Sequence, residues 1–444
     1  HYKDANDYLQ NGKYKELYET WVAAKKHIPK GIINGFSSIK ALLSERGISL
    51  LGTYPLPQLQ LMLKGLHAGE FVLIKGMEGL GKQLANTTQI PTVDGWTTMG
   101  EIKVGDVILG ADGKPTNVTF VTEDQLVDNY EVKFNDGTSV VAGGPHKWGV
   151  LTQSNSYRVK TTDEIISEGV ICKNNASRYS VPIMKPMELP YKRLLINPYW
   201  LGYWLGSGHA YSADLSVGKE DFGNWDQTNV KFFREDRTDI TVRVNEIVYD
   251  DLSSNNLIKN KHIPKEYLRG CIDQRRELLK GLMDSDGLVT KDGACEFYTS
   301  SEQLRDGFLE LARSLGYACR LRTKQSKLYG VNKKLAYTIS FRSVNGYDVF
   351  KLERKAIRVS CTEKTRLTKK SIISITKVPT VKSRCITVDN KDHLYVCDKG
   401  WTVTHNTEIF RLMENHLLKT TEYPIGIIHL EENTATTIKA IATY

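Results

Sequence analysis

The chain has 444 residues, of which 40% are hydrophobic and 25% charged, and its formal net charge is +9. This length favours about three domains of ordinary globular composition. No run of about 18 apolar residues predicts a membrane span, the polar amino terminus lacks the pattern of a signal peptide, and the seven cysteines contain no C-x-x-C pair. Membrane partners, a disulfide framework and a zinc site are therefore not expected, and a cytoplasmic location is. The basic excess fits nucleic-acid binding and a solvated basic surface equally well.

The first strong motif is half of a phosphate-binding loop. Residues 71–82 read FVLIKGMEGLGK, an apolar run that predicts a buried strand followed by G-x-x-x-x-G-K. The loop residues are Gly76, Gly79, Gly81 and Lys82. The motif then needs Ser or Thr for magnesium, but the next residue is Gln83, and no amphipathic helix follows it. A phosphate loop needs a helix directly after it, because the amino terminus of the helix binds the anion.

The other half of the motif lies near the end of the chain. Residues 404–418 read THNTEIFRLMENHLL, and from Thr407 onward the apolar residues recur at helical spacing. Joining Lys82 to Thr407 completes G-x-x-x-x-G-K-T between a strand and a helix, and the apolar run 425–428 predicts a further strand. This alternation is typical of an α/β nucleotide-binding domain. Removing residues 83–406 joins the two halves into one complete motif, so we interpret that segment as an insertion.

The flanks of the insertion, LKGLHAGEFVLIKG and IIHLEEN, resemble phage-type replicative helicases of the RecA-like α/β fold. The resemblance implies ATP and Mg²⁺ as ligands, a hexameric ring on single-stranded DNA, and a Glu that activates the attacking water. Glu431 or Glu432 occupies the matching position. No second acidic magnesium-binding strand and no arginine finger follow, so we expect that this fragment does not hydrolyse ATP by itself, either as the precursor or after the loop is joined.

The inserted segment begins as a series of short strands. They are separated by the hairpin signals Asp94-Gly95, Gly105-Asp106, Asp112-Gly113 and Asp136-Gly137. The two ends, QLANTTQIPTVDGW and RCITVDNKDHLYVCDKGWTVTHN, resemble the terminal blocks of inteins. That resemblance implies an all-β Hint fold, a horseshoe that brings the two ends of the insertion together.

The last residues of the insertion carry the chemistry of chain cleavage. The side-chain nitrogen of Asn406 can attack its own backbone carbonyl, which forms a succinimide and cuts the chain before Thr407. His405 can polarise that carbonyl or move the proton. The Thr407 hydroxyl can accept the upstream segment. His405-Asn406 before Thr407 is similar to the carboxy-terminal splice signature of inteins.

The start of the insertion departs from most inteins, which begin with Cys or Ser, because Gln83 has no nucleophile. Cys385, in Ser-Arg-Cys-Ile-Thr-Val, stands where common inteins carry Asp. In Gly-Gly-Pro-His146-Lys-Trp148 the His resembles that of the internal T-x-x-H block, with a Trp two residues later. Together with Thr404, these residues are similar to the Trp-Cys-Thr signature of class 3 inteins, which do not use their first residue as a nucleophile.

This resemblance implies a mechanism without a cofactor. His146 donates a hydrogen bond or a proton at the nitrogen of the first junction, Lys82–Gln83, and the Cys385 thiolate attacks the carbonyl of that bond. Trp148 and Thr404 are expected to orient Cys385 and not to react.

One position departs from the pattern, because Gly143 replaces the Thr of T-x-x-H and a hydrogen bond at the first junction is then missing. With Gln83, it leaves open a second hypothesis, an inactive insertion that silences the helicase. The remaining cysteines are expected to be structural: Cys172, Cys271, Cys295, Cys319, Cys361 and Cys397.

Two segments inside the insertion share a pattern. Residues 200–208 read WLGYWLGSG and residues 279–287 read LKGLMDSDG; they align position by position and resemble the paired LAGLIDADG motifs of homing endonucleases. The resemblance implies an α+β domain in which two helices pack through small residues and their last acidic residues bind Mg²⁺. Asp286 holds the metal position of the second motif, but Ser207 holds that of the first, and a hydroxyl is a poor substitute for a carboxylate. We therefore expect DNA binding with little or no double-strand cleavage, which is the third hypothesis for the chain.

Basic residues around the two motifs are candidates for a strand surface that contacts phosphates. They are Lys231, Arg234, Arg237, Arg243, Arg320, Arg322, Lys324, Lys327, Lys333 and Lys334. The expected domains are an upstream flank at 1–82, a splicing domain at 83–186 and 366–406, an endonuclease-like domain at 187–365 and a downstream flank at 407–444. The expected fold class is therefore multidomain: all-β, α+β and partial α/β.

Overall fold

The computed structural model divides the chain into two compact units, residues 1–73 with 409–444 and residues 74–408. It describes residues 4–24, 50–54, 60–61, 63–67, 83–223, 230–235, 239–245, 247–328, 331–360, 368–390, 392–405, 417 and 420–421. Several predicted site residues lie outside the described residues: Gly76, Gly79, Gly81, Lys82, Asn406, Thr407, Glu431 and Glu432. The helix expected after Thr407 and the strands expected at 71–74 and 425–428 also lie outside them. None of the helices in the described part is long and apolar enough to span a membrane.

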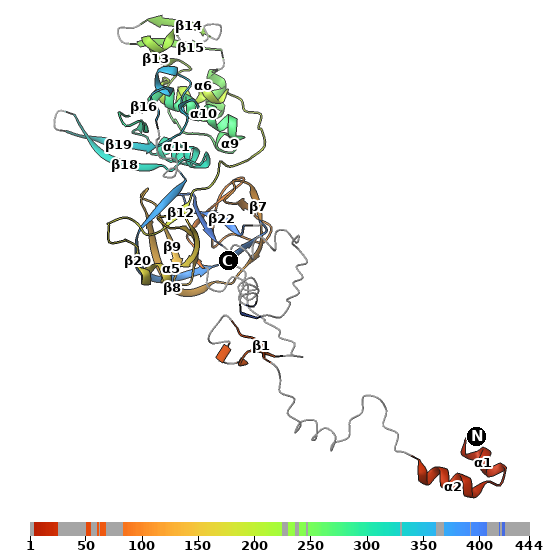
Figure 1. The fold of residues 1–444 in the computed structure, drawn as a ribbon. Helices are drawn as coiled ribbons and strands as arrows, with labels where there is room; N and C mark the ends of the chain where they lie inside the picture. Colours follow the sequence, from red (N-terminus) through yellow and green to blue (C-terminus); the bar gives the residue numbers. More distant parts are fainter. Residues whose placement is uncertain are drawn as a thin grey trace. The chain divides into compact units, whose positions relative to one another are not determined.

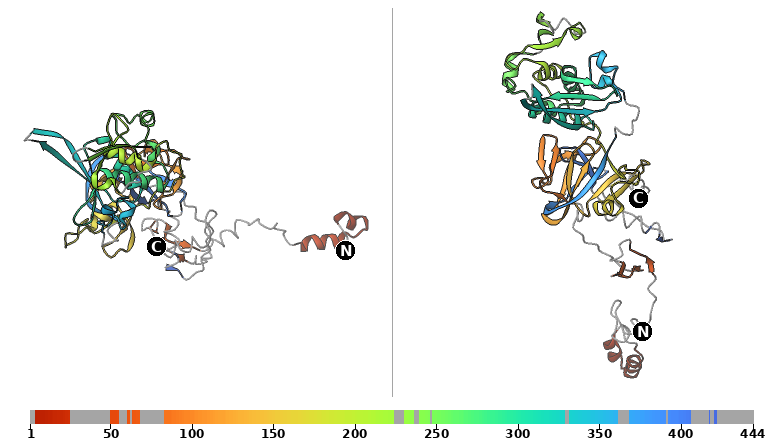
Figure 2. Two further views of the ribbon diagram at one scale, coloured as in Figure 1. Left: turned by 90° about the horizontal axis from the view of Figure 1, so that it is seen from above. Right: turned by 90° about the vertical axis from the view of Figure 1, so that its left-hand side faces the viewer.

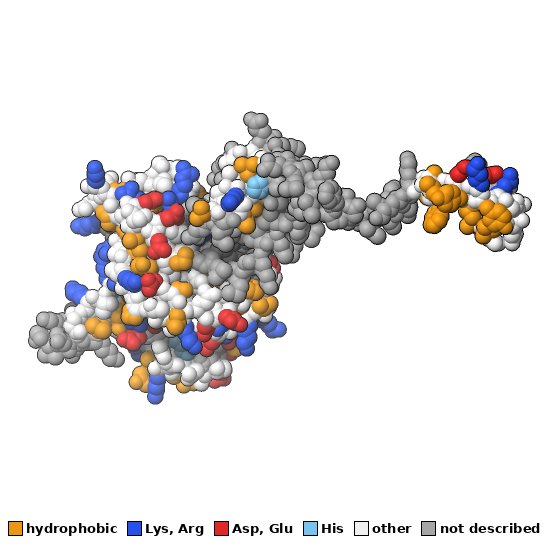
Figure 3. All heavy atoms as spheres, turned by 90° about the horizontal axis from the view of Figure 1, so that it is seen from below, with side chains coloured by type: hydrophobic (Ala, Val, Ile, Leu, Met, Phe, Trp, Pro, Cys, Tyr) orange, Lys and Arg blue, Asp and Glu red, His pale blue; other side chains and the backbone are white. Residues whose placement is uncertain are grey.

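The described part of the first unit is small. Its elements are α1 (Ala5–Gln10), α2 (Tyr14–Ala23), β1 (Leu50–Gly52) and β2 (Leu66–His67), and β1 pairs antiparallel with β2. Asp4 caps α1 by accepting the amides of Asn6 and Asp7. Hydrophobic side chains gather on the two helices (Figure 3), and Tyr14, Tyr18 and Trp21 of α2 are exposed.

The second unit contains an all-β part, which we call the β part, formed by residues 83–186 and 368–405 (Figure 1). Its strands are β3 (Leu84–Ala85), β4 (Gln89–Thr92), β5 (Gly95–Thr98), β6 (Val107–Leu109), β7 (Pro115–Val121), β8 (Gln125–Phe134), β9 (Ser139–Gly143), β10 (Lys147–Leu151), β11 (Tyr157–Thr161), β12 (Ser180–Pro182), β20 (Lys369–Arg384), β21 (Ile386–Val388), β22 (Leu394–Cys397) and β23 (Thr402–His405). One sheet has the order β11-β10-β12-β20-β3-β9-β8 and another β21-β7-β6-β4-β5, while β22 pairs with β23. The short helix α5 (Thr162–Glu168) follows β11. The expected all-β character of this part is therefore confirmed.

Glycine-containing turns set the hairpins of the β part. Asp94-Gly95 joins β4 to β5, Asp112-Gly113 joins β6 to β7, and Asp136-Gly137 joins β8 to β9, as the sequence predicts. Gly113 has φ +84° and Gly137 has φ +89°, a region that glycine enters without steric cost. Gly105-Asp106 forms a turn that leads into β6 but does not join two paired strands.

Residues 187–360 form the second part of this unit, which we call the α+β part. Its elements are α6 (Pro198–Ser207), β13 (Leu215–Gly218), α7 (Lys219–Phe222), β14 (Val230–Glu235), β15 (Asp239–Val244), α8 (Tyr249–Ser254), α9 (Lys265–Leu268), α10 (Ile272–Asp286), β16 (Gly287–Val289), β17 (Cys295–Thr299), α11 (Glu302–Ser314), β18 (Arg320–Leu328), β19 (Val331–Phe341), η2 (Gly346–Asp348) and α12 (Glu353–Ala356). The strands form one sheet of order β16-β17-β19-β18 and another of order β13-β15-β14. The hairpin of β18 and β19 extends away from the body of this part (Figure 2).

Helices α6 and α10 pack through glycines, as the paired motifs predict. A Cβ atom added at Gly202 would lie 2.3 Å from the Leu278 carbonyl oxygen, and one at Gly281 would lie 2.0 Å from the Tyr199 carbonyl oxygen. Only glycine allows the two backbones this approach. The ends of both helices consequently come together: a Cβ atom added at Gly206, next to Ser207, would lie 3.3 Å from Asp286 Cγ.

The chain leaves the β part and returns to it along neighbouring strands. Pro182 at the end of β12 pairs with Lys369 at the start of β20, and the Ile183 amide donates to the Thr368 carbonyl at 2.9 Å. The two ends of the α+β part therefore connect to β12 and β20, which are neighbouring strands of one sheet.

Candidate functional site

The first residue of the insertion lies opposite the predicted nucleophile. Strand β3 pairs antiparallel with β20 through Ala85 with Ser383 and Leu84 with Arg384. One further step along this register sets Gln83 opposite Cys385. The Cys385 amide donates to Thr122 Oγ1 at 2.9 Å, its carbonyl accepts the Thr122 amide at 3.0 Å, and its side chain is 2% exposed.

Gln83 is also held from its other side. Its carbonyl accepts the Gly143 amide at 2.9 Å, and its side-chain Nε2 donates to Gln125 Oε1 at 2.8 Å. The Gln83 side-chain oxygen is buried and has no hydrogen-bond partner among the residues that the structure describes. Gly143 therefore supplies a backbone hydrogen bond to Gln83, while the side-chain bond of a Thr at this position is missing, as the sequence predicts.

His146 is fully buried three residues after Gly143, and its amide donates to the Gly143 carbonyl at 3.0 Å. Its ring Nε2 lies 2.6 Å from Thr404 Oγ1, so β23 and the turn before β10 are joined by this contact. The structure thus brings together His146 and Thr404, which are far apart in sequence. Thr404, which the sequence predicts to orient Cys385, contacts His146, and its role toward Cys385 stays a prediction.

Trp148 supports His146 directly. The two ring centroids are 4.7 Å apart at an interplanar angle of 68°, an edge-to-face contact. The indole nitrogen of Trp148 donates to Thr162 Oγ1 at 3.1 Å, and the Thr162 amide donates to the His146 carbonyl at 2.9 Å. Alternation along β10 turns Trp148 and Val150 inward, which explains why the aromatic ring lies under the histidine.

Tyr395 completes this site, and the sequence analysis missed it. It pairs with Thr404 across the β22–β23 hairpin and is 2% exposed. Burial raises the pKa of the Tyr395 phenol well above its ordinary value, and the nearby Cys397 and Cys385 raise the pKa further. The phenol is therefore neutral at physiological pH and lies within electrostatic range of Cys385. In residues 393–397, HLYVC, only the alternation of a strand is visible, and nothing marks Tyr395 as a site residue.

His405 is partly buried and pairs with Leu394 at the end of the same hairpin. His405, directly after Thr404, is the last residue of this segment that the structure describes. Residues Lys82, Asn406 and Thr407, which the sequence predicts as junction residues, lie outside the described residues.

A second candidate site lies where α6 and α10 end. Asp286 ends α10 close to the end of α6, and burial raises the pKa of its carboxyl group. Lys261, missed by the sequence analysis, donates to the carbonyl oxygens of Gly208 at 2.7 Å and Gly206 at 3.3 Å. Burial lowers the pKa of Lys261 to about 8, although Asp286 raises it.

These residues do not form a good site for Mg²⁺. Such an ion prefers several oxygen ligands with carboxylates among them, but here one carboxylate faces a hydroxyl and an ammonium group. The neighbouring Asp284 is engaged elsewhere, accepting from Tyr199 Oη at 3.0 Å and from the Lys351 amide at 3.1 Å. Within the described ranges, no three His, Cys, Asp or Glu side chains gather to hold a metal ion.

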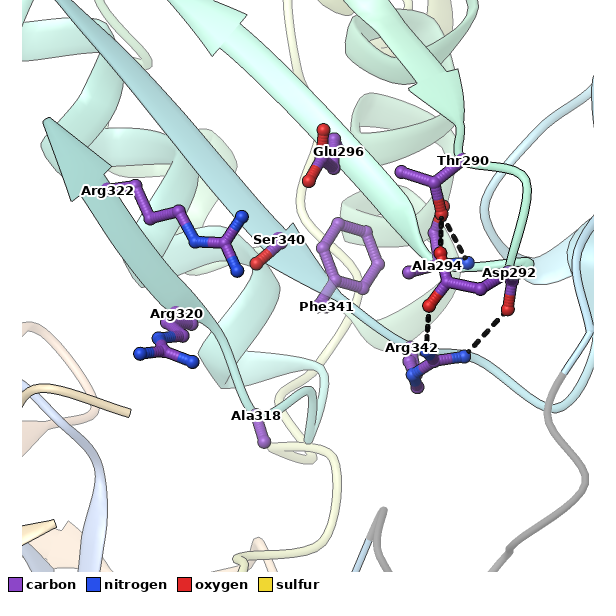
Figure 4. Close-up of a pocket in the computed structure, with 10 residues that line it drawn as sticks. All are labelled: Thr290, Asp292, Ala294, Glu296, Ala318, Arg320, Arg322, Ser340, Phe341 and Arg342. Atoms are coloured by element: carbon purple, nitrogen blue, oxygen red, sulfur yellow. Dashed lines mark hydrogen bonds and ion pairs between the residues drawn. The ribbon is translucent and has the colours of Figure 1, made fainter. Parts of the chain in front are cut away.

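The four-stranded sheet carries a charged hollow of about 390 Å³. Figure 4 shows Arg320 and Arg322 on the same strand, two positions apart, with Glu296 and Ser340 on neighbouring strands. Arg320, Arg322 and Lys324 of β18 are exposed and, because strand side chains alternate, they share one face. This face presents positive charge to the solvent.

Other predicted basic residues lie on a different sheet from this face. Lys231, Arg234 and Arg243 belong to β14 and β15 of the separate three-stranded sheet. Arg243 is paired with Asp214, with Nε at 2.6 Å from Oδ1. These three residues therefore lie on a different sheet from Arg320, Arg322 and Lys324, and a phosphate-contacting surface to which both sheets contribute stays a prediction. Arg237 and the side chains of Lys327, Lys333 and Lys334 lie outside the described part.

Comparison with known sequences gives two kinds of relative. Residues 262–349 match the family described as homing endonuclease. The replicative DNA helicase DnaB of Mycobacterium intracellulare is 36% identical over 363 residues, which are 76% of this chain and 61% of that protein. The replicative DNA helicase DnaB of Mycobacterium leprae (strain TN) is 37% identical over 128 residues, which are 29% of this chain and 20% of that protein. The chain thus spans less than two thirds of the length of either relative.

Among solved structures, the MchDnaB-1 intein is 18% identical, with 73% of this chain and 99% of that chain covered and a TM-score of 0.25. The homing endonuclease I-DmoI in complex with DNA and Mn is 15% identical, with 37% and 96% covered and a TM-score of 0.24. TM-scores this low do not establish a shared fold. The chain is thus similar over about three quarters of its length to a DnaB protein, and residues 262–349 are similar to homing endonucleases.

Proposed function

We propose that residues 83–406 form an intein, a self-excising protein-splicing element, inserted in a relative of the replicative helicase DnaB. The observation that carries the proposal is the pairing of β3 with β20, whose register, continued by one residue, sets Gln83 opposite Cys385. We assign the nucleophile to Cys385 and the proton donor to His146, which forms a buried contact with Thr404, so that the first step needs no contribution from the side chain of Gln83.

The first step is an exchange of an amide for a thioester. The Cys385 sulfur attacks the carbonyl carbon of Lys82, the carbon–nitrogen bond to Gln83 breaks, and the departing nitrogen takes a proton. We assign the donation of that proton to His146, because imidazole exchanges protons near neutral pH. Trp148 holds the imidazole edge-to-face, and Thr404 bonds its Nε2.

The second and third steps move the upstream segment and release the insertion. The Thr407 hydroxyl attacks the thioester carbonyl, which forms an ester and frees the Cys385 thiol. The Asn406 side-chain nitrogen then attacks its own carbonyl carbon, so the bond to Thr407 breaks and a succinimide forms. The freed amine of Thr407 attacks the ester, and the resulting shift from oxygen to nitrogen leaves an ordinary peptide bond.

The product of these steps restores G-x-x-x-x-G-K-T by joining Lys82 to Thr407. We propose that a full-length helicase with this joined loop binds ATP with Mg²⁺ and works as a DnaB-type hexamer on single-stranded DNA, with Glu431 as the residue that activates water. The precursor lacks the joined loop and is expected to be inactive as an ATPase.

Intact-mass spectrometry of the purified chain, incubated at neutral pH with a reducing agent, tests the proposal. Splicing gives an excised piece of 324 residues (83 to 406) and a joined piece of the remaining 120. Both masses are expected. A full-length mass that persists would instead support the silenced precursor, in which the junctions are intact and inert.

The exposed basic face of β18 favours a second activity, DNA binding by the α+β part. Arg320, Arg322 and Lys324 lie on one face of the strand that borders the hollow of Figure 4. We propose that this face contacts the backbone of a duplex and that Ser207 leaves the nuclease site without its second carboxylate. Binding to a duplex that encodes the joined loop, without double-strand cleavage in Mg²⁺, is the expected outcome; a linearised plasmid would contradict it.

A further inference from the structure

The turn between β22 and β23 is strained and tightly bonded. Asp398 has φ +63° and Trp401 has φ +53°, both in the left-handed region of backbone conformation that residues other than glycine rarely adopt. The Trp401 amide donates to the Asp398 carbonyl at 2.9 Å, and the Gly400 amide donates to Asp398 Oδ2 at 2.9 Å. This turn leads directly into β23, the strand that carries Thr404 and ends at His405.

One buried cation holds the turn from within the β part. Lys370 of β20 donates from Nζ to the Gly400 carbonyl at 3.1 Å and to Thr402 Oγ1 at 2.9 Å. Its charge is balanced by Asp136, whose Oδ2 lies 3.0 Å away. The first residue of β23 is therefore fixed by a charge-assisted bond, which is stronger than a neutral one.

A second buried cation reaches the same turn from the α+β part. Arg313 of α11 is 7% exposed, and its Nη1 donates to the Lys399 carbonyl at 2.9 Å. Its Nη2 donates to the Cys319 carbonyl at 3.3 Å, which anchors the guanidinium on its own side. The next residue, Ser314, is bonded by Arg275 and by the Met187 amide, so the end of α11 is itself held in place.

We infer that Arg313 is a positioning residue for splicing, supplied by the endonuclease-like part to the strand that carries Thr404 and His405. The inference rests on the proposed function. Arg313 fixes the Lys399 carbonyl, Lys370 fixes the next residue and Thr402, and β23 follows without a break. The side chains of Thr404 and His405 thereby receive their positions relative to His146 and the second junction. Losing this support shifts His405 against the Asn406 carbonyl and slows cyclisation.

The test separates the two junctions. Cleavage after Asn406 is timed in a Cys385→Ala background, in which the first step is blocked, and thiol-induced cleavage at Gln83 is timed in an Asn406→Ala background. Arg313→Gln is expected to slow the first of these reactions by about tenfold or more, because small misplacements of reacting groups carry large kinetic effects. The thiol reaction is expected to slow less, and Arg313→Lys, which keeps one charged donor, is expected to restore most of the rate.

The matched control is Arg305→Gln on the same helix. Arg305 bonds Asp306 with Nε at 2.8 Å and stacks on Tyr337, both within the α+β part. The control is expected to react at the parent rate. Equal slowing of both junctions by Arg313→Gln and Arg313→Lys, with a matching fall in melting temperature, would show a merely structural role and overturn the inference. An unchanged rate in Arg313→Gln would overturn it as well.

Amide hydrogen exchange provides a readout that does not depend on splicing. Peptides that cover residues 401–405 are expected to exchange faster in Arg313→Gln than in the parent chain, Arg313→Lys and Arg305→Gln. If the parent chain shows no cleavage, the proposed function fails, while faster exchange still supports the clamp on β23. Exchange that is identical in all four chains would overturn the clamp whatever the cleavage assays show.

Discussion

Cys385 receives its position from backbone pairing. The register of β20 with β3 sets it opposite Gln83, and two hydrogen bonds to Thr122 fix its own peptide group. A change of its side chain therefore leaves the pairing in place. The nearby phenol of Tyr395 stays neutral, so it adds no negative charge that would oppose formation of the thiolate.

Replacing Cys385 should block cleavage at the first junction, whereas replacing Gln83 should leave it nearly unchanged. Cys385→Ala is expected to lower cleavage at the first junction by about a thousandfold or more, because no other step forms the thioester. Gln83→Ala is expected to be nearly silent, since it removes one hydrogen bond and one buried oxygen without a partner. Intact-mass time courses measure both. A dead Gln83→Ala variant would show that the first residue takes part and that the class 3 assignment is wrong.

Gly143→Thr should improve the first junction. A Cβ at this position would lie 3.6 Å from both the carbonyl and the side-chain oxygen of Gln83 and 3.4 Å from Val127 Cγ2, which is ordinary contact. The threonine hydroxyl can then donate to the unpartnered Gln83 oxygen, a bond worth about 1 kcal/mol. We expect a higher melting temperature and faster thiol-induced cleavage than in Gly143→Val, the control of equal shape. Equal behaviour of Thr and Val would contradict the hydrogen-bond explanation.

At the residue scale, the sequence blocks predicted His146, Trp148, Thr404 and Cys385, and the structure brings the first three into contact. Tyr395 was missed, because a tyrosine in an alternating strand reads like any half-buried aromatic residue. Gln125, Lys261 and Arg313 were missed for a related reason. Their partners are backbone or side-chain groups far away in the sequence, and no local pattern indicates such contacts.

At the scale of elements, the crossing of α6 and α10 depends on two glycines. Gly281→Ala is expected to destabilise the α+β part by about 3 kcal/mol, because the added methyl group would collide with the Tyr199 carbonyl oxygen. Gly223→Ala is the control, since no atom lies within 4 Å of its added Cβ. Urea unfolding measures both. A small effect at Gly281 would mean that the helices can separate without loss of packing.

Ser207→Asp tests whether the nuclease site lacks only one carboxylate. The new side chain would face Asp286, so without metal the two charges repel and the melting temperature should fall. Mg²⁺ should restore it, because a divalent ion neutralises both groups. Melting temperatures with and without Mg²⁺, together with a plasmid-cleavage assay, test whether Ser207→Asp creates a Mg²⁺ site. A Mg²⁺-independent melting temperature would show that the site near Lys261 excludes the ion.

The elements themselves were largely readable from sequence. Both motif helices and the hairpins at Asp94-Gly95 and Asp136-Gly137 follow from local patterns, since glycine turns and helix-packing residues act within a few positions. The division of the basic residues between two sheets was not readable. It depends on which distant strands pair, and alternation within a strand does not specify its neighbour.

At the scale of the whole molecule, the Lys370–Asp136 pair lies where the two parts of the second unit meet. Both side chains are buried, at 4% and 7% exposure. Burial alone raises the pKa of Asp136, but Lys370 and two hydrogen bonds from Thr138 bring it below the ordinary value. A carboxyl group with a lowered pKa stabilises the folded chain above its unfolded pKa, and this contribution is lost as the pH falls through the lowered value.

Lys370→Met should therefore destabilise the chain by about 3–5 kcal/mol at neutral pH, because it leaves Asp136 buried without its ion-pair partner. The difference from the parent chain should shrink as the pH falls through the lowered pKa of Asp136, because the protonated carboxyl group no longer needs the ammonium group. Melting temperatures of both chains across this range measure the effect. A difference that stays constant with pH would exclude the ion pair as its cause.

The neighbouring exit and entry points at Ile183 and Thr368 have a consequence for how such a chain changes over generations. The α+β part takes the place of a loop between β12 and β20. Because its two ends lie close together, it adds little to the entropic cost of closing that loop. Acquiring a passenger needs only a loop to open. Losing one is harder, because the Lys399 carbonyl must find another donor once Arg313 has gone. The β part then depends on the α+β part for this hydrogen bond, and that asymmetry favours keeping the α+β part whether or not it cuts DNA.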